Sequence, residues 1–158
     1  RMLLDQLNQL VVLKSKLTTT KTYEYLHQIA ENIHRRSMIF LFTDMFEPGT
    51  ENEKLFNALR HLKYNKHEVI LFHVYDEDRE LTFNFDNTPK RFTDVETGEF
   101  IDVYADNIKE NYELMVRDFF KNIKLKCGQY QIKYVPMNIN DNFNKILTTY
   151  MVERQKFA

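Results

Sequence analysis

Two stretches of consecutive apolar residues interrupt a chain that is otherwise patterned for helices. The first, Met38–Thr43, ends on Asp44 and precedes a polar loop, and the second covers residues 69–75. Neither stretch alternates between apolar and polar side chains. Both are therefore predicted to be strands buried on both faces, the kind found in a parallel sheet.

Apolar residues at helical spacing predict five helices around these strands. The periodic positions are Leu3, Leu7, Leu10 and Val11; Leu26, Ile29, Ala30 and Ile33; Leu55, Ala58, Leu59 and Leu62; Ile108, Tyr112, Met115, Val116, Phe119 and Ile123; Phe143, Ile146, Leu147, Tyr150 and Met151. The first helix is expected over residues 2–13. Thr20 or Thr22 is expected to cap the second, and Cys127-Gly128 to end the fourth. A strand, a helix and a strand in this order predict a right-handed βαβ unit.

Residues 76–104 break this pattern and are predicted to be an insertion. They are polar, and two short alternating runs, 91–95 and 99–103, are typical of an antiparallel hairpin. Gly98 is expected to supply the positive φ of the turn. A third strand around Tyr134 is expected to stop at Pro136. The fold class is therefore α/β, with a mainly parallel sheet and an inserted hairpin.

Composition limits the classes of function. The 158 residues suffice for one domain with a substantial core. The net charge of −1 gives no global field that would attract nucleic acid. No apolar run approaches the roughly 18 residues that cross a bilayer, and Cys127, the single cysteine, excludes an internal disulfide and a cysteine-based metal site. A cytoplasmic location fits this composition. Since the chain begins with Arg1 in an amphipathic pattern, it is expected to be a fragment or a processed chain.

Asp44 is the leading candidate for a functional residue. Ligands of parallel sheets sit outside the carboxyl ends of the strands, and a carboxylate there can bind a divalent cation. The alternative is that Asp44 caps the following turn. A second oxygen ligand is available from the loop hydroxyls of Thr18, Thr19, Thr20 and Thr22, and the alternative for each is helix capping.

Other chemistry receives less support. The five histidines show no convincing zinc spacing, and His73 is expected to be a core histidine with satisfied partners. Cys127 lies beside Lys124 and Lys126, which are expected to lower its pKa somewhat, but no catalytic partner is evident. With three glycines in the chain, a phosphate-binding glycine loop is nearly excluded. Asp44 as a phosphoryl acceptor lacks a second aspartate next to it.

Several motifs together resemble one family over essentially the whole chain. They are Arg35-Arg36 before a strand that ends in Thr43-Asp44, then Leu55-x-x-Ala58-Leu59-x-x-Leu62, His67-Glu68-Val69, and Arg91-Phe92-x-Asp94-x-Glu96-Thr97-Gly98-Glu99 followed by Tyr112. The sequence resembles the C-terminal half of the domain-of-unknown-function family number fifty-eight, a bacterial, von Willebrand factor A-like family. Residues 1–158 are accordingly expected to form the C-terminal portion of one such domain.

The resemblance implies a Rossmann-like, three-layer sandwich, here partial, and a metal-ion-dependent adhesion site. Asp44 matches the last aspartate of that site, and Thr20 or Thr22 matches its threonine. The Asp-x-Ser-x-Ser loop that completes it is not present in this sequence. Mg²⁺ or Mn²⁺ is implied for an intact domain, and no cofactor is expected in this portion. Family members are typically encoded beside MoxR-type AAA ATPases.

The expected function is a non-enzymatic protein-binding module that acts with a MoxR-type ATPase through an incomplete adhesion-type site. The alternatives are an Asp44-dependent phosphohydrolase or phosphoacceptor domain, and a structural fragment without a ligand. The family's strand order further implies that Met38–Thr43 is an exposed apolar edge, which pairs in a homodimer or is covered by residues 2–13.

Overall fold

The fold was obtained as a computed structural model, which describes residues 22–34, 36–45, 51–82, 88–93 and 98–156. The helix expected over residues 2–13 and the candidate ligand Thr20 lie outside these residues. The described elements alternate between strands and helices along most of the chain, as an α/β fold requires.

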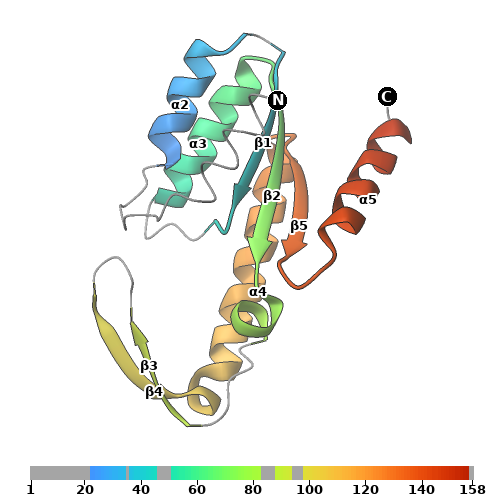
Figure 1. Ribbon diagram of the computed structural model, residues 1–158. Coiled ribbons are helices and arrows are strands. Elements are labelled where there is room, and N and C mark those ends of the chain that lie inside the picture. Colours follow the sequence, from blue (N-terminus) through green and yellow to red (C-terminus); the bar gives the residue numbers. More distant parts are fainter. Residues whose placement is uncertain (1–21, 35, 46–50, 83–87, 94–97, 157–158) are drawn as a thin grey trace, which may run out of the picture.

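A three-stranded parallel sheet forms the centre of the molecule (Figure 1). Its strands are β1 (Met38–Thr43), β2 (Glu68–Tyr75) and β5 (Lys133–Asn138), in the order β1-β2-β5. In the register of this sheet, Phe40 of β1 lies beside Ile70 of β2, and Phe72 of β2 lies beside Val135 of β5. The predicted α/β class with a parallel sheet is confirmed, and the sheet is compatible with a Rossmann-like fold.

Helices cover the two faces of the sheet unequally. The helices α2 (Thr22–Asn32), α3 (Glu51–Tyr64) and α4 (Ala105–Gln129) share the larger core cluster with one face of the strands. Helix α5 (Phe143–Lys156) lies on the opposite side (Figure 1). It packs through Leu147 and Tyr150 against Ile70, Phe72 and Val135.

The apolar stripe of α3 shows why this segment is helical. Leu55, Ala58, Leu59 and Leu62 recur at helical spacing and are all buried. Removing one leucine side chain from water contributes about 1.5–3 kcal/mol, so the stripe holds α3 against β2 and α2. The prediction for this segment is confirmed.

Strand β1 corrects one expectation. Ile39 and Leu41 face the core helices, whereas Met38, Phe40 and Phe42 are 40%, 48% and 49% exposed. The prediction of burial on both faces is therefore wrong for β1, although it is right for the central part of β2. The reason is that α5 packs mainly over β2 and β5, so that among the described elements it covers this side of the edge strand β1 only in part, through Tyr150 at Phe40 and Arg154 at Met38.

The inserted section contains the expected hairpin. Strands β3 (Pro89–Thr93) and β4 (Phe100–Tyr104) pair antiparallel, and Gly98 has a φ of 75°. Across the pair, the Arg91 guanidinium donates two hydrogen bonds of 2.8 Å to the Asp102 carboxylate. Ahead of the hairpin, residues Glu77–Leu81 form a single π-helical turn, η1.

Two predicted boundaries are wrong. Strand β5 continues through Pro136 to Asn138, because proline is tolerated on an edge strand, where a missing N–H leaves no inner partner unpaired. Helix α4 runs past Cys127-Gly128 to Gln129, and the chain turns at Gln131, which has a φ of 55°. None of the helices in the described part of the chain is long and apolar enough to cross a membrane.

Candidate functional site

Asp44 stands where the sequence placed it, directly after the last residue of β1, and it is exposed. The next residue, Met45, is fully buried and has a φ of 60°. The Met45 N–H donates to the Thr43 hydroxyl over 3.1 Å. The turn after β1 is therefore anchored by a buried side chain, which fixes the main chain that carries Asp44.

A buried histidine, His73, forms a hydrogen bond to the main chain of this turn. His73 Nε2 lies 3.1 Å from the Asp44 carbonyl oxygen, and His73 Nδ1 lies 2.8 Å from the Tyr134 hydroxyl. A carbonyl oxygen can only accept, so Nε2 carries the hydrogen and Nδ1 accepts from Tyr134. Burial lowers the pKa of His73, and its bond to the Asp44 main chain opposes this only partly. His73 is thus a neutral, satisfied core histidine, as predicted.

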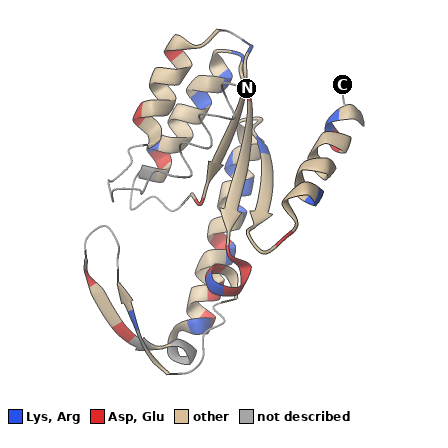
Figure 2. Ribbon diagram, viewed as in Figure 1, with Lys and Arg blue, Asp and Glu red and all other residues tan. Residues whose placement is uncertain are grey.

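Acidic residues follow the second strand as well. Asp76 comes directly after β2, and its carboxylate accepts from the main-chain N–H groups of Asp78 and Arg79 over 3.1 and 3.3 Å. It thereby caps the η1 turn, in which the acidic Glu77, Asp78 and Glu80 accompany the basic Arg79, seen as red and blue segments in Figure 2. Burial raises the pKa of Glu80 in this turn, a hydrogen bond with the Asp76 main chain opposes the rise in part, and the charges of Asp44 and Asp76 add to it. The carboxyl ends of β1 and β2 therefore share one region of negative potential.

The end of β5 is tied to the same region. Asn138, the last residue of β5, is buried, and its side-chain amide donates to the Glu77 carboxylate over 2.9 Å. The Asn138 side-chain oxygen accepts from the Asn140 N–H over 3.2 Å. The Asn140 amide in turn donates to Asp76 over 3.3 Å. Polar side chains thus link the ends of β2 and β5.

Sequence reasoning missed Asp76 and Asn138, although a usable signal exists. Asp76 directly follows the second apolar run, as Asp44 follows the first. The carboxyl ends of neighbouring parallel strands lie at the same edge of a sheet. The sequence therefore allows the prediction that Asp44 and Asp76 lie at one edge. The place of Asn138 could not be predicted, because Pro136 suggested that its strand had already ended.

Of the three predicted metal ligands, the structure describes Asp44 and Thr22. Thr22 is the first residue of α2, and Thr20 is not described. Within the described ranges no three His, Cys, Asp or Glu side chains are placed to hold one ion. Asp44 and Thr22 offer one carboxylate and one hydroxyl, whereas Mg²⁺ requires octahedral coordination by oxygen. These donors alone do not fit a divalent cation.

The structure also shows the surroundings of two histidines and of the single cysteine. His27 on α2 and His61 on α3 approach to 3.1 Å between their Nδ1 atoms, a contact that their separation in sequence concealed. One ring must donate and the other accept, so the pair links two helices. Cys127 is fully buried, and this burial raises its pKa to about 12. The expected lowering by neighbouring lysines is therefore wrong, and the thiol is inert at neutral pH.

Comparisons with known proteins identify no relative. No protein family, curated protein or solved structure matches this chain.

Proposed function

We propose that this chain is a non-enzymatic protein-binding module, and that it docks a partner protein at the carboxyl edge of its sheet around Asp44. One observation carries the proposal: an exposed carboxylate stands on a main chain that is held from below by the buried His73 and Met45. A group presented in this way loses little conformational freedom when it binds, which favours association.

The charges of the edge indicate what the partner presents. The negative charges of Asp44 and Asp76 repel the carboxylate of Glu80, which is partly desolvated, and Arg79 of the same turn offsets part of this charge at 3.7 Å from Asp76. A cationic side chain from a partner relieves this repulsion, and an arginine can bind a carboxylate through two hydrogen bonds. We therefore expect a basic, arginine-containing surface on the partner.

The resemblance noted in the sequence supplies a specific partner for this proposal. It suggests a von Willebrand factor A-like domain that acts with a MoxR-type AAA ATPase. Because the described donors do not fit a divalent cation, docking in this proposal relies on direct contacts between the acidic edge and the partner.

Titration calorimetry between this chain and a purified MoxR-type AAA ATPase tests the proposal. We expect saturable binding that weakens at least 10-fold in Asp44→Ala. The matched control is Asp118→Ala, which removes the same charge from an exposed position on α4 and should bind as the unchanged chain does.

Two results contradict the proposal. One is equal binding by Asp44→Ala and the unchanged chain, which places docking elsewhere. The other is phosphate release or a trapped acyl phosphate that disappears in Asp44→Ala, since that outcome makes Asp44 a nucleophile.

A further inference from the structure

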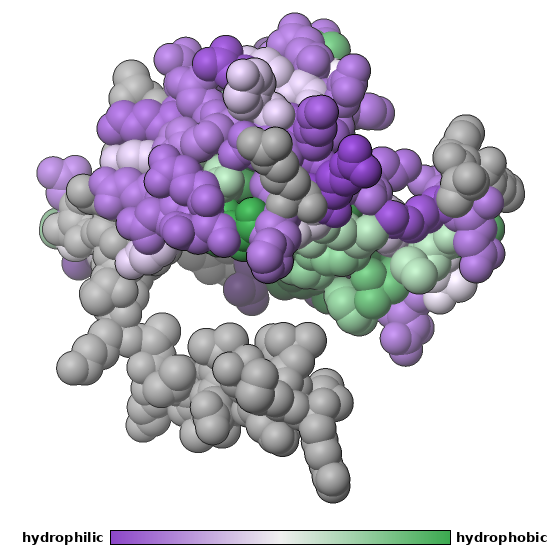
Figure 3. Space-filling view, turned by 90° about the horizontal axis from the view of Figure 1, so that it is seen from above, coloured by the Kyte–Doolittle hydropathy of each residue, from purple (hydrophilic) through white to green (hydrophobic). Residues whose placement is uncertain are grey.

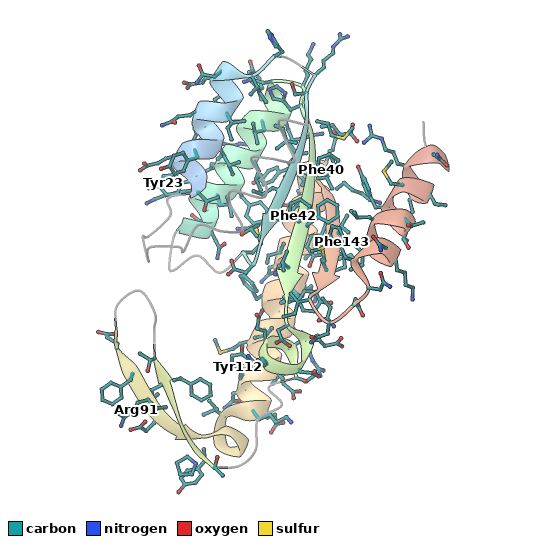
Figure 4. The ribbon with its side chains drawn as sticks, viewed as in Figure 1. Tyr23, Phe40, Phe42, Arg91, Tyr112 and Phe143 are labelled. Atoms are coloured by element: carbon teal, nitrogen blue, oxygen red, sulfur yellow. The ribbon has the colours of Figure 1, made fainter. Side chains whose placement is uncertain are left out.

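Strand β1 presents both an open edge and an open face. Within the residues that the structure describes, β1 pairs only with β2. Phe40 and Phe42 point to the side of the sheet on which α5 lies (Figure 4), and they remain about half exposed beside that helix. A space-filling view shows hydrophobic residues gathered beside the C-terminal helix (Figure 3). An exposed edge of this kind is a template for pairing with another chain.

The exposed side chains of β1, an apolar row formed by Met38, Phe40 and Phe42, pack against neighbouring aromatic rings. Phe42 stacks on the buried Phe72 with 4.6 Å between ring centroids, and Phe40 meets Tyr150 of α5 edge-on at 6.2 Å. Arg154 of α5 holds Glu68 through hydrogen bonds of 2.8 and 2.9 Å. These contacts hold α5 over β2 and leave Phe40 and Phe42 about half exposed.

The two edges of the sheet differ in a way that points to use of the β1 edge. The outer strand β5 carries Lys133 and Pro136, and lysine and proline are the residues with which proteins block unwanted strand pairing. Strand β1 reads Met-Ile-Phe-Leu-Phe-Thr and has neither. The unguarded edge is also the one with an apolar row on its open face.

Charges at the two ends of β1 indicate which partner fits. Arg36 precedes the strand and Asp44 follows it, both are exposed, and they lie at equal distances in sequence from Phe40. A second β1 laid antiparallel about Phe40 therefore brings the end of each copy that carries Arg36 next to the end of the other that carries Asp44. Both residues lie just outside the strand, and opposite charges that meet at these ends favour association.

We propose that two copies of this chain associate through antiparallel β1 strands, with the twofold axis at Phe40. In this register Met38 faces Phe42 of the second copy, and the two Phe40 side chains face each other. Side chains that pair across antiparallel strands point to the same face of the joined sheet. The exposed Met38, Phe40 and Phe42 side chains of the two copies therefore meet on one face. The product is one continuous six-stranded sheet with α5 of each copy on the same face, an isologous interface.

Sedimentation equilibrium of the 158-residue chain tests association first. The expected mass is twice the 19.2 kDa of one copy. Phe40→Lys places two like charges at the twofold axis and should weaken dimerisation at least 10-fold, with an unchanged circular dichroism spectrum because Phe40 is half exposed. The matched control, Met115→Lys at an exposed position on α4, should remain dimeric. A monomer at every concentration overturns the proposal.

A charge exchange tests the register separately. Arg36→Asp and Asp44→Arg should each weaken dimerisation at least 10-fold, because each sets like charges opposite each other. The double variant should dimerise again, and an equimolar mixture of the two single variants should form a heterodimer. Aspartate tolerates the φ of 66° at position 36. Arg60→Asp, on the exposed surface of α3, is the control. If both single variants dimerise as strongly as the unchanged chain, this register is wrong.

Discussion

His73 Nε2 donates a hydrogen bond across 3.1 Å to the main-chain carbonyl of Asp44. The bond joins the carboxyl ends of β2 and β1, and its donor is a buried imidazole whose other nitrogen accepts from the Tyr134 hydroxyl only while the ring is neutral. The chemistry of an interior side chain thereby determines how an exposed carboxylate is held.

The neutral state of His73 predicts a loss of stability in acid. Burial lowers its pKa in the folded chain below the ordinary 6.5, so below pH 6.5 the unfolded chain binds the proton and the folded chain does not. Stability contributed by this group is therefore complete above pH 6.5 and falls as the pH drops toward the lowered pKa. Urea unfolding at about pH 7.5 and about pH 5 should show this decrease.

Two variants check that assignment. His73→Gln retains one donor and one acceptor without a titrating ring, so its unfolding free energy should change less between the two pH values. His34→Gln, at an exposed position, should retain the full decrease. Equal slopes for His73→Gln and the unchanged chain would remove His73 as the cause.

Removing the His67 imidazole should stabilise the chain. His67 is buried, and neither of its ring nitrogens has a hydrogen-bond partner among the residues that the structure describes. An unpaired buried polar group is costly, so His67→Leu should raise the unfolding free energy by about 1 kcal/mol. The informative control is His73→Leu, which strips Tyr134 and the Asp44 carbonyl of a partner and should destabilise the chain. If both leucine variants lose stability, the His67 ring is satisfied after all.

Helix α5 should open locally when its anchor is lost. Arg154 contacts Glu68 on β2, the Tyr150 hydroxyl and the Met38 sulfur. In Arg154→Ala we expect faster amide hydrogen exchange throughout α5, with little change in α3. Lys145→Ala removes an exposed cation from the first turn of the same helix and should leave exchange unchanged. The double variant Arg154→Glu with Glu68→Arg, which swaps the two charges, should restore part of the protection. If the amide hydrogens of α5 exchange at the same rate in all variants, Arg154 does not anchor the helix.

The Cys127 thiol should react only through unfolding. Its pKa of about 12 and complete burial leave almost no accessible thiolate near neutral pH. Labelling by an aromatic disulfide reagent should therefore be slow. Leu59→Ala, which costs about 2–5 kcal/mol through its cavity, should speed labelling in proportion to the unfolded population. Fast labelling of the unchanged chain would show that Cys127 reaches solvent in the folded state.

The local sequence pattern was sufficient to predict those elements that are determined by residues close in sequence. The apolar stripe of α3 and the Gly98 hairpin were predicted because spacing and turn chemistry determine them. The apolar runs of β1 and β2 look alike, yet only β2 is buried on both faces. Burial depends on which strand α5 packs against, and no local window contains that information.

The candidate site was predicted in part for the same reason. Asp44 follows from the strand-end rule, but its support by His73 arises from a contact between β1 and β2. The link from Asn138 to Glu77 joins residues separated by 61 positions. Such links follow from strand order, which the sequence constrains only through general rules.

The proline and lysine of β5 also limit how far any assembly can grow. A sheet that accepts a neighbour at either edge can extend indefinitely into a fibril. Here one edge lacks a main-chain donor at Pro136 and carries a charged side chain at Lys133. Once the β1 edges are joined, both outer margins of the resulting sheet are β5 strands. Growth then terminates at two copies, because neither outer margin offers the apolar, unguarded edge that β1 provides.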